Sequence, residues 1–193
     1  MYPSYDRFCE FKAKGLRSQA HQLIPSVVQE FRSDPKEAFV IELCKGASGS
    51  KINHHLWQEI VLPFAKAGLE DNPVAIQCLI LTIQNLYGDK ASHEDLNRTT
   101  EEQLLRRMLK FDPHNTWART RLVDWLTGWL RYCIHEWPSG ILYGANGATI
   151  QESHEILEAV EELRSLDSDM KWRQLADDVA VKTHRYISRL EHK

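Results

Sequence analysis

The sequence predicts an all-α fold of antiparallel helical hairpins, stacked as a short α-solenoid. Leucine outnumbers valine by 22 to 9, which favours helices because an unbranched side chain loses little rotamer freedom there. Glycine is scarce, at 9 of 193 residues. Apolar residues recur at helical spacing, and capping residues followed by proline precede some of these segments. We expect a single domain over 1–193 with about eight or nine helices.

Predicted helices cover most of the chain. Periodicity, caps and proline positions predict the ranges 5–15, 17–32, 35–45, 51–68, 73–87, 100–110, 114–136, 150–165 and 169–190. One segment without helical character, near 138–149, is expected to form a short loop or hairpin.

Three Asp-Pro or Asn-Pro pairs mark expected helix starts. Proline fits the first turn of a helix, where its missing N–H is not needed, and the preceding side chain can cap that turn. The pairs are Asp34-Pro35, Asn72-Pro73 and Asp112-Pro113, spaced 38 and 40 residues apart. This spacing is close to the period of arrays in which each repeat is a pair of helices.

Capping boxes indicate further starts. In this motif a cap side chain and a Glu three residues later satisfy each other's backbone N–H groups. The matching pairs are Asp34 with Glu37, Thr99 with Glu102, and Thr149 with Glu152. Ser50, which follows the expected turn at 46–49, is predicted to begin the helix over 51–68.

Two segments have the strongest apolar patterns. In 51–68, apolar residues recur every four positions with Trp57 beside them, and Pro63 is expected to kink the helix. The segment 73–87 is apolar on most sides, so we expect it to lie between neighbouring helices.

The composition excludes several classes of protein. The chain has 24 Lys and Arg against 27 Asp and Glu, for a formal charge of −3, and six each of Trp, Tyr and Phe. A disordered chain would have few aromatic residues and a large charge imbalance. A charge of −3 gives no general attraction to phosphate, so nucleic-acid binding is not expected.

The cysteines and the apolar runs bear on location. Cys9, Cys44, Cys78 and Cys133 never occur as Cys-x-x-Cys, and we interpret them as small buried residues in a reducing compartment. No apolar run has the length of a signal peptide or a membrane span. We therefore expect no membrane association and a cytoplasmic location.

The residues around the third Asp-Pro pair resemble a known family. Residues 104–126 read LLRRMLKFDPHNTWARTRLVDWL. This run resembles the junction between tetratricopeptide-like repeats, where a helix ending in Leu is followed by Asp-Pro-x-Asn and a helix opening with x-x-Ala-Arg. The other two pairs lack the following Asn and Ala-Arg. The resemblance implies stacked helical hairpins, which present extended surfaces for binding.

A second resemblance concerns the chain as a whole. A small α-solenoid with this balanced charge is similar to some all-helical immunity proteins of bacterial contact-dependent toxin systems. That resemblance implies a protein that binds and blocks one toxin domain.

The small net charge hides a division between two segments. Residues 151–170 contain seven acids and one base, whereas 98–131 contains seven bases and four acids. In 151–170 the apolar residues keep one helix face for the core, which leaves the acids on the other. An acidic strip would steer a basic partner. The alternative interpretation is an ordinary solvated face.

The loop after the long helix is a second candidate surface. Asn146-Gly147 predicts a tight turn. Two interpretations stay open: Trp137 and Tyr143 pin the loop to the core, or the loop is exposed for recognition.

The leading interpretation is a non-enzymatic helical-repeat protein that binds a basic protein partner. In its most specific form, a bacterial immunity protein neutralises a cognate toxin by occluding its active site. The predicted partner-binding residues are Glu152, Glu155, Glu158, Glu161, Glu162, Trp137, Tyr143 and Asn146.

The runner-up is a helical enzyme or small-ligand-binding domain. Arg121, Asp124, Arg131 and His135 are spaced along one face of the predicted helix 114–136. Together they could hold an anion or move a proton, since His135 can change charge near neutral pH. A solvated helix face is the other interpretation of this strip. Nucleic-acid binding through 98–131 is the least expected function.

Little in the sequence supports nucleophilic or metal chemistry. Residues 46–50 do not match Gly-x-Ser-x-Gly. His93 and His154 each begin a His-Glu-x-x run that lacks the second His. We expect no catalytic residue, no metal and no cofactor.

Overall fold

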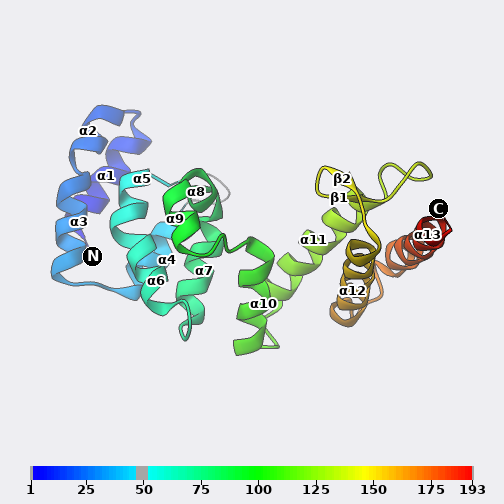
Figure 1. The fold of residues 1–193 in the computed structure, drawn as a ribbon. Helices are drawn as coiled ribbons and strands as arrows, with labels where there is room; N and C mark the ends of the chain where they lie inside the picture. Colours follow the sequence, from blue (N-terminus) through cyan, green and yellow to red (C-terminus); the bar gives the residue numbers. More distant parts are fainter. Residues whose placement is uncertain (1, 47–51, 193) are drawn as a thin grey trace. The chain divides into compact units, whose positions relative to one another are not determined.

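A computed structural model describes residues 2–46 and 52–192 of the chain (Figure 1). The described chain is helical apart from one two-stranded hairpin, so the predicted all-α class is confirmed. Contacts between Cα atoms divide it into two compact units, Met1–Phe111 and Asp112–Lys193. The α-solenoid arrangement and the single domain stay predictions.

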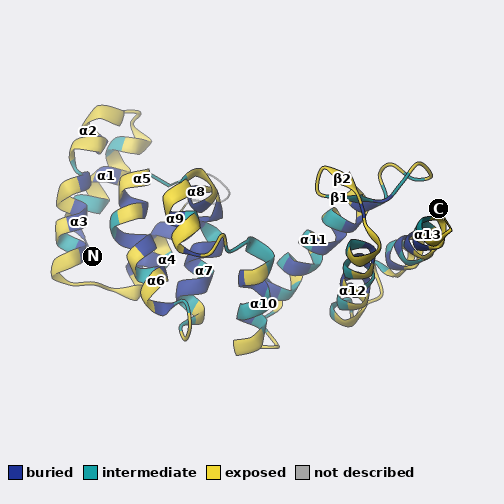
Figure 2. Cartoon of the chain, viewed as in Figure 1, coloured by how far each residue is buried: buried dark blue, intermediate teal, exposed yellow. Residues whose placement is uncertain are grey.

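The first unit is built from short helices. Its elements are α1 (Pro3–Ala13), α2 (Arg17–Gln22), α3 (Ile24–Ser33), α4 (Glu37–Lys45), α5 (His54–Leu56), the π-helical η1 (Trp57–Val61), α6 (Leu62–Gly68), α7 (Pro73–Leu81), α8 (Ile83–Gly88), α9 (Lys90–Asp95) and α10 (Glu101–Phe111). Helix α7 packs against α4, α6 and α10, and its buried residues lie in the centre of this unit (Figure 2). This confirms the prediction that the apolar segment lies between neighbours.

Two predicted helices are broken at residues that interrupt the helical pattern of backbone hydrogen bonds. The range 17–32 divides at Leu23, before Pro25, which has no N–H to continue the helix. The range 73–87 divides at Thr82, whose hydroxyl donates to the carbonyl oxygen of Cys78 at 2.8 Å. Such a bond from a Thr side chain to the preceding turn bends or ends a helix.

The expected kink at Pro63 takes the form of a π-helical turn. The N–H of Leu62 donates to the carbonyl oxygen of Trp57, five residues earlier. Because Pro63 cannot donate, the chain widens one turn just before it. Asn53 caps this helical stretch by accepting from the N–H groups of His55 and Leu56. The predicted start at Ser50 and most of the turn at 46–49 lie outside the described residues.

The predicted caps have mixed outcomes in the first unit. Asn72 accepts from the N–H of Val74 at 2.8 Å, as predicted, and Pro73 lies in the first turn of α7. The Asp34 and Glu37 box is wrong, because α4 begins at Glu37 with Lys36 as its cap residue. The Asp34 carboxylate instead forms an ion pair with Lys36 at 2.5 Å.

The second predicted capping box is not formed at the start of α10. Helix α10 begins at Glu101, and the N–H of Thr100 donates to Gln103 Oε1 at 3.2 Å. The Thr99 hydroxyl donates instead to the carbonyl oxygen of Leu96. The Thr99 and Glu102 box is therefore wrong.

The second unit is a set of longer helices with a hairpin. Its elements are α11 (Thr116–Cys133), β1 (Leu142–Tyr143), β2 (Asn146–Gly147), α12 (Ile150–Leu166) and α13 (Arg173–Glu191). Helix α12 packs against both α11 and α13. Its capping box of Thr149 and Glu152 is present as predicted.

The third Asp-Pro pair forms a turn and does not begin a helix. Asp112 Oδ1 accepts from the N–H of His114 at 3.0 Å. The cap of α11 is Asn115, which accepts from the N–H of Ala118 at 3.0 Å. The predicted start at 114 is two residues early because the Asn, and not the Asp, satisfies the first turn of the helix.

Burial of the cysteines follows the prediction at three of four positions. Cys44, Cys78 and Cys133 are buried, whereas Cys9 is exposed, so the prediction for Cys9 is wrong. Among the described residues, no helix combines the length and the apolar character needed to cross a membrane.

Candidate functional site

A small hairpin follows the long helix α11, as predicted, but its turn is elsewhere. Leu142 pairs with Gly147, and Tyr143 pairs with Asn146. The turn is made by Gly144, at a φ of +57°, and Ala145. The predicted turn at Asn146-Gly147 is wrong, because Gly144 supplies the left-handed conformation that the turn requires.

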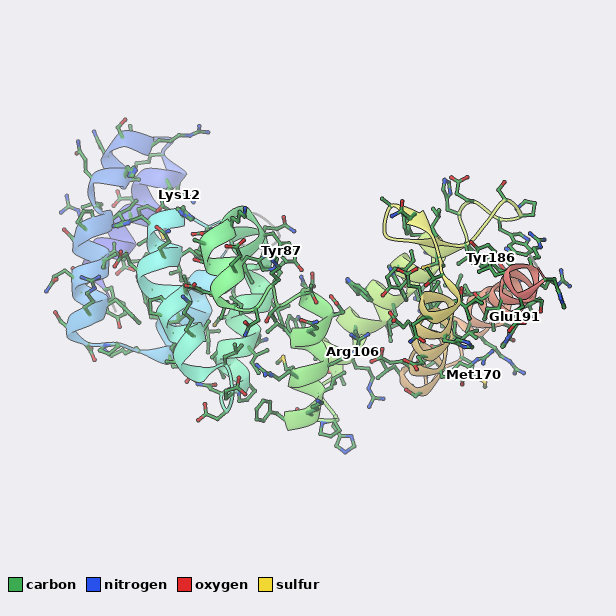
Figure 3. The ribbon with its side chains drawn as sticks, in the orientation of Figure 1. Lys12, Tyr87, Arg106, Met170, Tyr186 and Glu191 are labelled. Atoms are coloured by element: carbon green, nitrogen blue, oxygen red, sulfur yellow. The ribbon has the colours of Figure 1, made fainter. Side chains whose placement is uncertain are left out.

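Helix α13 contacts the loop that contains the hairpin. The Arg189 guanidinium lies 4.6 Å from the ring of half-buried Trp137 and donates to the carbonyl oxygen of Pro138 at 2.8 Å. A Cβ on Gly147 would lie 3.3 Å from the hydroxyl of Tyr186, which projects from α13 (Figure 3). These contacts hold the loop against α13, and the Arg189 guanidinium packs against the Trp137 ring.

Tyr143 connects the hairpin to the acidic helix. Its hydroxyl donates to Glu155 Oε2 at 2.5 Å. This hydrogen bond to a carboxylate, together with partial burial, raises the pKa of Tyr143 to about 12. The phenol is therefore protonated at neutral pH and keeps donating to Glu155.

Two tryptophans of α11 continue from Tyr143. The ring of Trp129 meets Tyr143 edge to face at a centroid distance of 5.9 Å, and it stacks on Trp125 at 5.8 Å. Both indoles are half-buried, so each leaves part of its ring in solvent. Since they are four residues apart, they project from the same face of the helix.

These contacts make one continuous surface. We call it the aromatic–acidic surface and define it as Trp125, Trp129, Tyr143, Glu155 and Glu158. Glu158 is exposed and lies one helical turn after Glu155. Tyr143 thus contacts both the carboxylate of Glu155 and the ring of Trp129, and Glu158 is included for its place on α12.

The other predicted acids are engaged locally or lie beside this surface. Glu152 accepts from the N–H and the hydroxyl of Thr149 at 2.8 and 2.9 Å. Glu161 pairs with Arg164 at 2.5 Å. Glu162 is half-buried, and Asn146 is exposed in the hairpin.

Three residues of the alternative strip each contact a different neighbour. The Arg121 guanidinium lies 5.7 Å from the Trp117 ring, and that of Arg131 lies 4.9 Å from the Trp172 ring. His135 Nε2 lies 3.6 Å from a carboxylate oxygen of Glu136, and Asp124 is exposed. The role proposed for this strip stays a prediction.

The described residues contain no group of three or more His, Cys, Asp and Glu side chains placed to hold a metal. A different feature of the second unit is a hollow of about 400 Å³ between the end of α12 and the start of α13. Buried Leu163 and Ala176 line it together with Met170, which is 64% exposed. The sequence analysis did not single out this hollow, because its walls come from two helices and the turn between them.

No family model matches the chain. No curated protein or solved structure matches it either. The candidate site therefore rests on the contacts of this chain alone.

Sequence reasoning missed two members of the aromatic–acidic surface. Trp125 and Trp129 are four residues apart in the sequence, and this spacing was the available signal. A Trp pair at this spacing packs in a core or remains at a surface, and only the positions of the neighbouring elements distinguish the two.

Proposed function

We propose that this chain is a non-enzymatic protein-binding module whose aromatic–acidic surface takes a basic segment of a partner protein. One observation carries the proposal: the hydrogen bond from Tyr143 to Glu155 joins a row of indole rings to a row of carboxylates. The two kinds of group therefore act on the same ligand side chain.

The chemistry of this surface suits lysine and arginine. The face of an indole attracts a cation within about 6 Å, and a carboxylate beside it can accept the cation's N–H donors. Half-buried Trp and Tyr are also the side chains that most often anchor protein interfaces. The surplus of acids in 151–170 would speed the approach of a basic partner.

In its most specific form, the proposal is a bacterial immunity protein that neutralises a cognate toxin by occluding its active site. Support comes from the resemblance of the sequence to all-helical immunity proteins. A toxin that cleaves nucleic acid needs a basic cleft, and an acidic surface covers such a cleft by charge complementarity.

The test is capture of a partner from a native extract with the tagged chain. We expect one stoichiometric partner with a basic binding region. Charge reversal at Glu155, Glu158 and Glu162 to Lys should abolish its capture. The single variant Glu158→Lys leaves the Tyr143 contact intact and should weaken capture by itself.

The matched control reverses three exposed acids of the first unit, Asp6, Glu42 and Asp71, to Lys. This control has the same change in net charge and should keep full capture. Equal capture by both triple variants would overturn the proposed surface. If the partner is an enzyme, one equivalent of the wild-type chain should abolish its activity, and a partner that stays active would overturn the inhibitory role.

A further inference from the structure

Gly128, on the exposed face of the long helix α11, has none of the usual structural reasons for a glycine. Its φ is not positive, and a Cβ added to it would meet nothing within 4 Å. A glycine inside a helix is less stable than an alanine, because the unfolded chain has more freedom to lose. The missing side chain leaves open space directly against the helix backbone.

Two aromatic side chains flank this open position. Trp125 lies three residues before Gly128 and Tyr132 four residues after it, so all three lie on one side of the helix. Trp125 is half-buried, and Tyr132 is 44% exposed. The Tyr132 hydroxyl donates to the carbonyl oxygen of Gly144 at 2.6 Å, which restrains its ring beside the hairpin. We call Trp125, Gly128 and Tyr132 the Gly128 site.

The tryptophans of the aromatic–acidic surface differ from the other partly exposed tryptophans. Each of the other three lies against a guanidinium of the chain itself, at 4.6 to 5.7 Å from the ring centroid: the pairs are Trp117 with Arg121, Trp137 with Arg189, and Trp172 with Arg131. No Lys or Arg in the described part of the chain lies over the ring of Trp125 or Trp129. These two indoles can therefore take a cation from another molecule.

We propose that the Gly128 site takes an arginine side chain from the basic segment of the partner, an inference that rests on the proposed function. The guanidinium lies flat against the Trp125 ring, and the partner's chain approaches the backbone of α11 over Gly128. Glu155 and Glu158 supply the opposite charge from α12, which packs against α11.

Arginine suits this position better than lysine does. The guanidinium is planar, stacks on aromatic faces and is more weakly hydrated than an ammonium group, so it loses less when it leaves water. A side chain at position 128 would separate the arginine from the helix. The absence of this side chain is therefore a specificity feature of the surface.

The test uses a short peptide in which arginine and glycine alternate, with matched peptides that carry lysine or citrulline in place of arginine. Binding to the full chain is followed by NMR of the indole N–H signals, assigned with Trp125→Phe and Trp129→Phe. We expect saturable shifts of both signals with the arginine peptide and about threefold weaker binding of the lysine peptide. The neutral citrulline peptide should not saturate. Equal affinity of the arginine peptide and either matched peptide would overturn the proposal.

Variants at position 128 separate binding from stability. Gly128→Gln fills the open space and should weaken binding of the arginine peptide about tenfold, because the added atoms block a close contact. Gly128→Ala should also weaken binding while the fold becomes no less stable, a division that denaturant unfolding of the same samples records. The matched control Ala38→Gln places the same side chain on an exposed position of α4 and should bind as the wild type does. Wild-type affinity in Gly128→Gln would overturn the Gly128 site.

Failure of this inference and failure of the proposed function give different results. If Glu158→Lys weakens capture of the partner and Gly128→Gln does not, the partner-binding surface stands and the Gly128 site is wrong. If the triple charge reversal on α12 leaves capture unchanged and Gly128→Gln abolishes it, the acidic part of the surface is wrong and the Gly128 site stands.

Discussion

At the scale of single residues, the Tyr143 hydroxyl links the aromatic part of the aromatic–acidic surface to its acidic part. Tyr143 is bound on one side to the carboxylate of Glu155 and on the other to the ring of Trp129. The sequence identified Tyr143 and Glu155 as candidates separately. Their contact depends on where the hairpin ends relative to α12, and residue types do not reveal this.

The hydrogen bond to Glu155 predicts a pH dependence in alkaline solution. Because the pKa of Tyr143 is raised to about 12, from about 10 for a free tyrosine, the folded state holds this proton more tightly than the unfolded state. The resulting stabilisation is present below pH about 10 and is lost as the pH rises toward 12. In the Glu155→Gln variant, the midpoint of the Tyr143 titration should fall toward the pKa of a free tyrosine.

The measurement is the phenolate absorbance of the wild type minus that of Tyr143→Phe, which isolates the titration of one residue. The same subtraction is made in the Glu155→Gln background. An identical midpoint in the two backgrounds would show that Glu155 does not hold the phenol proton.

Two helical glycines make a matched pair for stability. A Cβ on Gly68 would lie 2.7 Å from the Cβ of Ala75 and 2.8 Å from that of Asn72, whereas a Cβ on Gly128 meets nothing within 4 Å. Gly68→Ala should destabilise by about 1–3 kcal/mol, because the backbone of α7 must move. Gly128→Ala should stabilise by about 0.5–1 kcal/mol through lower chain entropy. Denaturant unfolding followed by circular dichroism measures both, and a stabilising Gly68→Ala would refute the close approach.

At the scale of elements, side chains that bond to the backbone decide where helices end. The apolar periodicity correctly predicted helix over most of the described part of 51–68 and over most of 73–87. It did not predict the π-helical turn before Pro63 or the break at Thr82. A hydrophobic pattern records which faces are buried and carries little information about the path of individual backbone hydrogen bonds.

Thr82, at the break between α7 and α8, also connects this region to η1. Trp57 Nε1 donates to Thr82 Oγ1 at 3.1 Å, and both residues are buried. Thr82→Val should leave this N–H without a partner in the core and cost about 1–3 kcal/mol. Thr82→Ser keeps the acceptor and should lose less. Thermal unfolding compares the two variants. Because Thr82→Val keeps a methyl group and removes the acceptor, whereas Thr82→Ser does the reverse, a loss in Thr82→Ser as large as that in Thr82→Val would contradict a dominant role for the hydrogen bond.

At the scale of the whole molecule, the charge division of the sequence is only partly a division of surfaces. The bases of 98–131 belong to two units and find local partners: Arg98 pairs with Glu94, Arg107 with Glu70, and Arg131 lies over Trp172. The acids of α12 share one helix, and one of them, Glu155, contacts Tyr143, whose ring meets Trp129.

The second unit has its own core, which leads to a prediction about the isolated segment. Helices α11, α12 and α13 pack on one another, and the hairpin is held from α11 and α13. We expect residues 112–193 alone to keep their helicity and to capture the same partner as the full chain. Circular dichroism and capture test this, and an unfolded segment would show that its core needs the first unit.

The sequence by itself determined the helical class, most of the helical ranges, the position of the non-helical segment near 138–149 and the concentration of acids in α12. These follow from composition, periodicity and local capping, which act over a few residues. Tertiary structure alone decided that Trp129, which stacks on Trp125, meets Tyr143, and that Tyr143 meets Glu155. The reason is physical: local propensities act between near neighbours in sequence, whereas a binding surface is made by side chains that packing brings together from different elements.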